Sequence, residues 1–446
     1  MLSAMINIYS GYISIVFLGL ASILILGKTY IKKLSNLSIL STSFLLGASI
    51  INGIFSILMI LGLPMTSLYV SLLAVLSTIY LGYRLFTSNF RIKYDFHKIY
   101  KIILYPTNLF LLILSLILIV HNVNWPVTDW DALTLYDFRG KIFSEGLRVE
   151  AVKSDIHDSY STFDYYYSYP FMTSTLHAWG YNLGASTPMM IYFGFYSSLV
   201  LIFIDKWGRK GDKFSLKNLF PVILACSSIL FSHATIAYSN LPYTVFFFCS
   251  IFFLLDEGHY SPFISTIMLT SSYLTRSLEP FWVITLALML YTMAKRKKIF
   301  QATLYSLIFL LFRHLWLNYA VVDLTNVRLN NISIYSILSK FNLKEFIQIE
   351  IFLFNNYITY IKIPSLLSIL SLYILIKEKI SLSLEWILVG LISGAILFGG
   401  GYIFAEKYTI WSSIGPSASR MMTPFIPLLL YFSFIYLSKY LDDKNY

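Results

Sequence analysis

Charged residues are scarce in this sequence. Asp, Glu, Lys and Arg make up 12% of the 446 residues, whereas hydrophobic residues make up 57%. A soluble globular domain usually contains about 25% charged and 45–50% apolar residues. Apolar runs of about 20 residues, each long enough to cross a bilayer, recur from one end of the chain to the other. The alternation typical of a membrane β-barrel is not visible, so the composition predicts an all-α polytopic membrane protein.

Cysteine is rarer still, and nucleotide-binding motifs are missing. Cys226 and Cys249 are the only cysteines. Both lie inside apolar runs without a CxxC motif, which predicts buried free thiols and no disulfide. His157 and His177 fit no metal-binding template, and no phosphate-binding loop or dinucleotide fingerprint occurs in a suitable context. We therefore expect no cofactor, and a divalent metal ion is left open.

The net charge of +11 does not indicate nucleic acid as a partner. The basic residues form short clusters between apolar runs, as the positive-inside rule produces, and not one continuous patch. All clusters can be placed on one side of a membrane, which is then the cytoplasmic side. They lie at residues 28–36, 84–101, 205–217 and 295–298, with weaker ones at 377–379 and 439–446.

The apolar runs predict about 13 transmembrane helices. The spans lie near residues 8–27, 37–62, 66–86, 102–121, 186–204, 218–236, 242–255, 263–278, 281–294, 300–318, 363–376, 382–401 and 421–438. The extracytoplasmic side then holds the loops 122–185, 237–241, 319–345 and 402–420. Within the first loop, we predict that residues 171–185 form a helix at the membrane interface. The apolar runs by themselves indicate one partner, the lipid bilayer.

The stretch NWPVTDWDALTLYDFRGKIFSEG, residues 124–146, is rich in charge and directly follows a predicted span. Its middle part predicts a short amphipathic helix with Asp131 as the N-cap. Asp137, Lys141 and Glu145 follow at i, i+4 spacing, which predicts a solvent-exposed row of charges that contributes little stability. The alternative is that charges placed just outside the membrane serve a function.

The Trp-Asp-Ala start of this helix, just outside a span, resembles the first external loop of the GT-C glycosyltransferases, membrane enzymes that use polyprenyl-phosphate sugars. The chain is similar to dolichyl-phosphate-mannose-protein mannosyltransferases and to the lipid A aminoarabinose transferase. Four further stretches match in order, and the resemblance covers roughly residues 100–430. These are YYYSYPFMTSTLHAWGYNLG (165–184), AYSNLP (237–242), SYLTRSLEPFW (272–282) and SASRMMTPFIP (417–427).

The resemblance implies a GT-C-like bundle whose first external loop carries interfacial helices. The catalytic domain would be residues 102–438, preceded by N-terminal transmembrane helices of unknown role at 1–101 and followed by a cytoplasmic tail at 439–446. The implied reaction transfers a sugar, with inversion, from a polyprenyl-phosphate donor to a hydroxyl of a glycan, lipid or protein acceptor. The implied location is the cell membrane, with the active site on the extracytoplasmic face.

The resemblance gives Asp131 the role of general base, since a positioned carboxylate can take the proton of an acceptor hydroxyl. Cations would stabilise the departing phosphate. Asn240 stands where relatives often have aspartate, and Arg276 and Glu279 are one residue further apart than the family's Lys-x-Glu. Arg313 and His314 lie in an apolar run but match no motif. The residues implied in substrate binding are Asp129, Arg139, Lys141, Tyr169, Asn240, Arg276, Glu279 and Arg420.

Two other classes of protein were weighed against this one. A transporter or flippase for a lipid-linked oligosaccharide would show internal repeats and charges at the bilayer midplane. No repeat is visible, and the charges gather at one membrane face. A polymerase or ligase that uses a lipid pyrophosphate would also carry external arginines, but it would not need the Trp-Asp-Ala helix directly after a span. The sequence therefore favours the glycosyltransferase.

Overall fold

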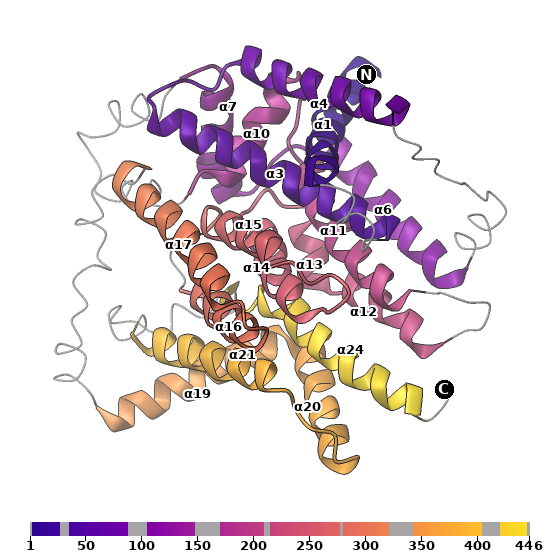
Figure 1. Ribbon diagram of the computed structural model, residues 1–446, viewed down its shortest axis with the longest axis vertical. Coiled ribbons are helices and arrows are strands. Elements are labelled where there is room, and N and C mark those ends of the chain that lie inside the picture. The colour runs from indigo at the N-terminus through magenta and orange to yellow at the C-terminus, as the bar shows by residue number, and fades with distance from the viewer. Residues whose placement is uncertain are drawn as a thin grey trace. The chain divides into compact units, whose positions relative to one another are not determined.

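The computed structural model describes residues 2–26, 35–87, 105–147, 170–208, 215–276, 280–320, 342–403 and 420–443. Within these ranges every regular element is a helix and no strand occurs (Figure 1). The chain forms two compact units, Met1–Ser161 with Pro170–Phe246, and Thr162–Tyr169 with Phe247–Tyr446. Helix α14, Asn240–Leu255, runs from the first unit into the second. The prediction of an all-α protein is confirmed for the described residues.

Long apolar helices build most of the first unit. These are α1 (Leu2–Leu26), α3 (Asn36–Ile60), α4 (Ser67–Thr87), α6 (Pro106–Asn124) and α11 (Met190–Trp207). Shorter helices connect them. The shorter ones are η1 (Ala132–Asp137), α7 (Phe138–Ser144), α10 (Met172–Asn182), η2 (Leu216–Leu219), α12 (Phe220–Ala225) and α13 (Ser228–His233).

Glycine permits an unusually close approach of α1 and α3. A Cβ atom on Gly19 would lie 1.7 Å from the carbonyl oxygen of Ser43, and one on Gly47 would lie 1.9 Å from that of Ile15. Side chains at these positions would force the helices apart. Small residues are a common way to bring helix backbones together in an apolar environment, where packing has to supply the attraction.

Helix α10 lies deep inside the first unit. All of its residues from Met172 to Gly180 are buried. The indole nitrogen of Trp179 donates a hydrogen bond to the Ser14 hydroxyl at 2.9 Å, which attaches α10 to α1. The predicted helix over 171–185 is therefore present, and the other helices of its own unit enclose it.

The second unit contains the remaining helices. Helices α15, α16 and α17 pack against one another, and α20 packs along α24. Helices α19 and α20 meet at a bend of 97°. The elements are α15 (Pro262–Tyr273), α16 (Trp282–Lys295), α17 (Ile299–Leu315), η3 (Trp316–Ala320), α19 (Leu343–Tyr360), α20 (Lys362–Lys377), α21 (Leu384–Gly394), η4 (Ala395–Gly400) and α24 (Phe425–Asp443).

Eight helices among the described residues are long and apolar enough to cross a membrane, or up to nine if the bent pair α19 and α20 is one span. By length and composition the chain is a multi-pass membrane protein. Helices α1, α3, α4, α6 and α11 coincide with the first five predicted spans. The predicted span 218–236 is divided into the two short helices α12 and α13. The figure of about 13 crossings stays a prediction.

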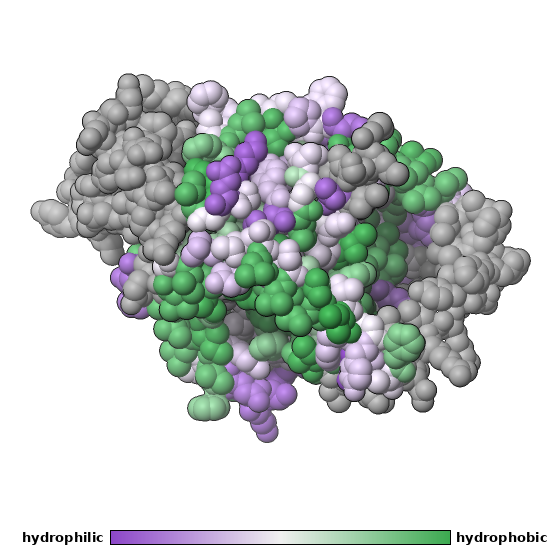
Figure 2. Space-filling view, turned by 90° about the horizontal axis from the view of Figure 1, so that it is seen from above, coloured by the Kyte–Doolittle hydropathy of each residue, from purple (hydrophilic) through white to green (hydrophobic). Residues whose placement is uncertain are grey.

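The surface agrees with a membrane environment. Figure 2 shows large hydrophobic areas exposed among polar ones on the face that it presents. Exposed leucine and isoleucine side chains recur along α4, α6 and α17. Cys249 is buried as predicted, but Cys226 is exposed, because it lies at the break between α12 and α13 and not inside one continuous helix. The prediction of two buried thiols was therefore wrong for Cys226.

Candidate functional site

A short helix follows α6 almost directly and carries most of the charges of the stretch 124–146. It starts at Trp130 and Asp131, continues as the π-helix η1 and ends as α7. The backbone N–H of Phe138 donates to the carbonyl oxygen of Leu133, five residues earlier, which is the hydrogen bond of a π-helix. Such wide turns occur frequently at functional sites.

The first turn of this helix presents the predicted general base. Asp131 is partly buried, and its side chain makes no capping hydrogen bond. Its backbone is already helical, which does not suit an N-cap residue. Asp129 is also partly buried, and Trp130 between them is 72% exposed. The structure therefore leaves the Asp131 carboxylate outside the bonding that starts the helix.

Asp137, at the end of η1, has the opposite environment. Its side chain is almost completely buried, with 2% of the residue exposed. Lys141 Nζ lies 2.9 Å from one carboxylate oxygen. The Tyr181 hydroxyl donates a hydrogen bond to the other oxygen, and His177 Nδ1 lies 3.6 Å from that same oxygen. Asp137 is thus the centre of a buried cluster that joins η1 and α7 to α10.

His177 extends the cluster to α11. The residue is fully buried, and its Nε2 atom lies 2.9 Å from the Tyr192 hydroxyl. A proton on Nδ1 would face Asp137, and Nε2 would then accept from Tyr192. We use "the Asp137 cluster" below for Asp137, Lys141, His177, Tyr181 and Tyr192.

The ionisation states of the cluster follow from burial and from these contacts. Burial alone raises the pKa of Asp137, but interactions with His177, Tyr181 and Lys141 outweigh it and lower that pKa to about 2. Burial lowers the pKa of His177, although the Asp137 carboxylate opposes this. Burial and the same carboxylate raise the pKa of Tyr181. At neutral pH the cluster therefore holds a carboxylate, a neutral imidazole and a neutral phenol.

The residues beside Asp137 pack as tightly as the backbone allows. A Cβ atom on Gly140 would lie 2.5 Å from the Cβ atom of His177, so α7 and α10 meet through this glycine. Arg139 is also buried, and its Nε donates to the Leu135 carbonyl oxygen at 2.9 Å. Its guanidinium lies 4.9 Å from the ring centroid of Phe171, in a cation–π contact. Arg139 is part of the packing between α7 and the start of α10.

These contacts correct one prediction from the sequence. Asp137 was expected in a solvent-exposed row of charges, but it is buried and bonded across helices. Lys141 and Glu145 are exposed, as expected for that row. The i, i+4 spacing of Asp137 and Lys141 could not indicate that Asp137 is buried, because the spacing is the same on an exposed helix. The sequence feature that could have indicated a partner for Asp137 is the pair His177 and Tyr181, which lie four residues apart on one face of α10.

The other predicted residues of the first unit lie on neighbouring elements. Asn240 is buried at the start of α14. Ser239, just before it, is hydrogen-bonded to the Tyr136 hydroxyl at 2.7 Å, which joins the AYSNLP stretch to η1. Asn122 near the end of α6 donates to the carbonyl oxygens of Met189 and Ala234, both at 3.0 Å. The stretch 124–146 and the AYSNLP stretch are therefore bonded to each other within this unit, through Tyr136 and Ser239.

Two of the remaining predicted residues are described, and both belong to the second unit. Arg276 follows α15 and is partly buried. Arg420 lies before α24, beside Tyr360, whose hydroxyl is 3.2 Å from that of Thr423. Tyr169 and Glu279 lie outside the described residues. Within the described ranges, no three His, Cys, Asp or Glu side chains come together as a metal site.

The fold and the cluster define a class of protein, a multi-pass helical membrane protein with a buried ionic cluster on the short helices between two candidate spans, α6 and α11. No protein-family model, curated protein sequence or solved structure matches this chain.

Proposed function

We propose that this protein is an integral membrane glycosyltransferase of the GT-C type. It moves a sugar from a polyprenyl-phosphate donor to a hydroxyl of a glycan, lipid or protein acceptor on the extracytoplasmic face of the cell membrane. Asp131 is the general base. The substrate-binding residues of the proposal are those implied by the family resemblance.

One observation carries this proposal, the contrast between two carboxylates on one helix. The Asp137 carboxylate already contacts three side chains, and these contacts attach the helix to α10. Asp131 stands one π-helical segment away, partly buried and without a capping bond. A general base needs a fixed position and a carboxylate that can still accept a proton. The contacts of Asp137 with α10 fix the position of the helix that carries Asp131. The Asp131 carboxylate makes no capping hydrogen bond, so it can still accept a proton.

The proposed step balances as a single displacement. The acceptor hydroxyl gives its proton to the Asp131 carboxylate while its oxygen attacks the anomeric carbon of the donor. The bond from that carbon to the phosphate oxygen breaks, and the electron pair leaves with polyprenyl phosphate. Configuration at the anomeric carbon inverts because attack and departure are on opposite faces. Developing charge on the phosphate is stabilised by guanidinium groups, which pair with phosphate oxygens in a bidentate manner.

Release of free polyprenyl phosphate from a panel of polyprenyl-phosphate sugars tests the proposal. The purified protein in lipid nanodiscs is expected to turn over at least one donor. The turnover rate of Asp131→Asn should be about 10²–10⁴-fold lower than that of wild type, because the general base is removed. Glu145→Gln is the matched control, since Glu145 is an exposed carboxylate at the end of the same helix. Equal rates in wild type and Asp131→Asn would remove Asp131 from its role, and no turnover of any donor would contradict the class.

The proposed orientation is tested by labelling single cysteines in intact cells. Cys226→Ser removes the exposed thiol. In that background Glu145→Cys should react with a membrane-impermeant maleimide. Lys298→Cys, at the exposed turn between α16 and α17, should react only after the membrane is permeabilised. Labelling of both positions from the same side would contradict the orientation and leave the chemistry of the enzyme assay untouched.

A further inference from the structure

Helix α19, Leu343–Tyr360, has no part in the proposed function, and a sharp bend separates it from α20. Together the two helices are long and apolar enough for one membrane span, but their axes meet at 97°. A span cannot continue straight through such a bend, so the two helices take different directions relative to a bilayer. The direction of α20 therefore decides how α19 lies.

Helix α20 runs beside α24 and in the same direction. The Tyr360 hydroxyl, at the bend, lies 3.2 Å from that of Thr423, just before α24. Further along, the Ser368 hydroxyl lies 3.2 Å from that of Ser433, and the Ser371 hydroxyl donates to the Ser433 carbonyl oxygen at 3.2 Å. The residue numbers of the partners thus rise together along both helices. Because α24 is one of the candidate membrane spans, α20 crosses the membrane beside it, and a helix at 97° to α20 lies close to the membrane plane.

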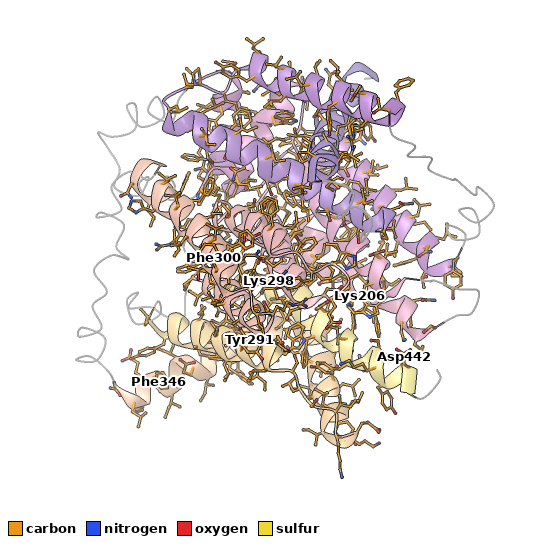
Figure 3. The ribbon with its side chains drawn as sticks, viewed as in Figure 1. Lys206, Tyr291, Lys298, Phe300, Phe346 and Asp442 are labelled. Atoms are coloured by element: carbon orange, nitrogen blue, oxygen red, sulfur yellow. The ribbon has the colours of Figure 1, made fainter. Side chains whose placement is uncertain are left out.

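The candidate span formed by α21 and η4 meets α19 at its own C-terminal end. The ring centroids of Phe346, labelled in Figure 3, and of Tyr402 lie 5.0 Å apart. The Tyr357 hydroxyl donates to the Leu397 carbonyl oxygen at 2.9 Å. From Phe346 to Tyr357 the helix α19 extends about 16 Å, whereas Leu397 and Tyr402 are at most about 8 Å apart along the span. Helix α19 therefore passes across the end of this span and does not run along it.

The side chains of α19 divide into three sectors around the helix axis. One sector is apolar and exposed, the next is polar and exposed, and the third packs against the protein. At 3.6 residues per turn, each set of side chains covers about 80–100° of the circumference. Phe352 is the apolar residue within the polar sector, and it is partly buried. The apolar sector, 37–62% exposed, holds Leu343, Ile347, Ile351, Phe354 and Ile358; the polar sector holds Lys344, Glu345, Gln348, Asn355 and Thr359; the packed sector holds Phe346, Ile349, Leu353, Tyr357 and Tyr360.

This division distinguishes α19 from a helix that crosses the bilayer. A crossing helix would direct the exposed amides of Gln348 and Asn355 at hydrocarbon, where polar groups without partners are costly. Glu350 lies more than about 10 Å from either end of α19. A crossing helix would therefore carry its carboxylate deep into the bilayer, where ionisable groups are costly. A helix in the membrane plane keeps all these groups at the level of the headgroups.

We propose that α19 is an interfacial helix that lies flat on one membrane surface, with the boundary between acyl chains and lipid headgroups as its partner. The apolar sector inserts about 5–10 Å into this boundary, the depth typical of such helices. The polar sector faces headgroups and water, and the packed sector contacts the end of the span α21–η4. The orientation assigned from the basic clusters makes this surface the extracytoplasmic one. The placement of α19 does not depend on the proposed chemistry.

The membrane depth of spin labels tests the inference on the full-length protein in phosphatidylcholine nanodiscs. In a Cys226→Ser background, which removes the exposed thiol, Ile347→Cys, Ile351→Cys, Phe354→Cys and Ile358→Cys each place one label in the apolar sector. The ratio of collisions with oxygen to collisions with a water-soluble nickel chelate measures the depth of each label. The four depths should agree within one helical pitch, about 5 Å. A crossing helix would spread them over about 16 Å, because each residue adds 1.5 Å.

Exposed apolar positions of α20 supply the matched control. Ile363→Cys, Leu366→Cys, Leu370→Cys and Tyr373→Cys have nearly the same spacing along the chain, and all four residues are exposed. Their labels should lie steadily deeper, by about 15 Å in total, because α20 crosses the membrane beside α24. A melting temperature near that of the unlabelled protein shows that each labelled variant keeps the fold.

The polar sector completes the test. A label at Gln348→Cys should collide more often with the nickel chelate than one at Ile351→Cys. A steady change of depth from Ile347 to Ile358 would overturn the inference, because α19 would then be half of a span. Equal access of the chelate to both sectors would place α19 in water, and equal shielding of both would bury it in the bilayer; either result also overturns it. Loss of sugar transfer leaves these depths unchanged, so the proposed function fails or holds separately.

Discussion

The Asp137 cluster and the Arg313 end of α17 are two charged regions in a chain that has few charges. In the first, a buried carboxylate is surrounded by a lysine, a histidine and a tyrosine from two helices. In the second, a guanidinium is framed by aromatic rings, and no carboxylate of the described residues neutralises it. A charge that is satisfied within the protein contributes to structure. The two regions therefore differ in whether a group of opposite charge within the described residues balances the ion.

Removing Asp137 should have the largest effect on stability. Asp137→Ala leaves the Tyr181 hydroxyl and His177 Nδ1 without a partner inside the fold, and an unsatisfied buried polar group costs about 1–3 kcal/mol, or about 2–6 kcal/mol for the two. The free energy of unfolding in detergent, measured by denaturant titration, should fall by that amount. Glu145→Ala, which removes an exposed carboxylate from the same segment, should change it by less than about 0.5 kcal/mol. Similar values for the two variants would mean that Asp137 is no anchor.

Gly140→Ala should have the next largest effect. The added methyl group would lie 2.5 Å from the His177 Cβ atom, so α7 must move away from α10. Overpacking of this kind costs about 1–3 kcal/mol. Gly390→Ala in α21 is the control, because nothing lies within 4 Å of its new Cβ and alanine is the better helix former by up to about 1 kcal/mol. Thermal unfolding should therefore shift down for the first variant and slightly up for the second.

Acid should weaken the Asp137 cluster in a defined direction. Burial holds the pKa of His177 below its ordinary value of about 6.5, so the unfolded chain takes up more protons as the pH falls below that value. Stability should then decrease by up to about 1.4 kcal/mol per pH unit. Asp137, with its pKa lowered to about 2, adds a loss in the same direction between about pH 4 and pH 2.

The comparison of pH profiles isolates the histidine. His177→Gln should flatten the stability profile just below pH 6.5, because glutamine does not titrate. A profile of His177→Gln that is as steep as that of wild type would assign the slope to other groups.

Removing Arg313 should have the smallest effect on stability. Arg313→Met loses cation–π contacts worth about 0.5–1 kcal/mol each at such sites. It also removes the buried Nε atom that has no partner in the described ranges, which offsets the loss. The free energy of unfolding should stay within about 1 kcal/mol of wild type. A loss as large as that of Asp137→Ala would make Arg313 a structural residue and remove the distinction between the two regions.

The sequence predicted what depends on nearest neighbours along the chain. Apolar runs of helix length gave α1, α3, α4, α6 and α11, and amphipathic spacing gave the helix after Trp130. The Asp137 cluster could not be predicted in this way, because Tyr181 is 44 residues away in the chain. Burial of Asp137 depends on α10 folding over α7, and the spacing within η1 and α7 carries no information about that contact.

The break at Cys226 and the π-helical turns were missed for a different reason. The run 218–236 is apolar throughout, and hydropathy does not register a change of backbone direction between α12 and α13. A π-helix differs from an α-helix by a single hydrogen-bonding step, which no residue pattern in ALTLYD marks. Arg313 and His314 were visible as charges in an apolar run, but only the aromatic rings of Trp282 and Tyr273 distinguish Arg313 from a membrane anchor.

The π-helix η1 also has a consequence for how such a chain can evolve. A helix that closes its bonds over five residues, as Phe138 does with Leu133, accommodates one residue more than a regular α-helical turn. Deleting one residue between Asp131 and Asp137 would restore the regular helix and leave the anchor on α10 intact. It would turn everything before the deletion by about 100°, the rotation of one helical residue. The smallest change of gene length, a single codon, is therefore enough to redirect Asp131 without loosening the helix that carries it.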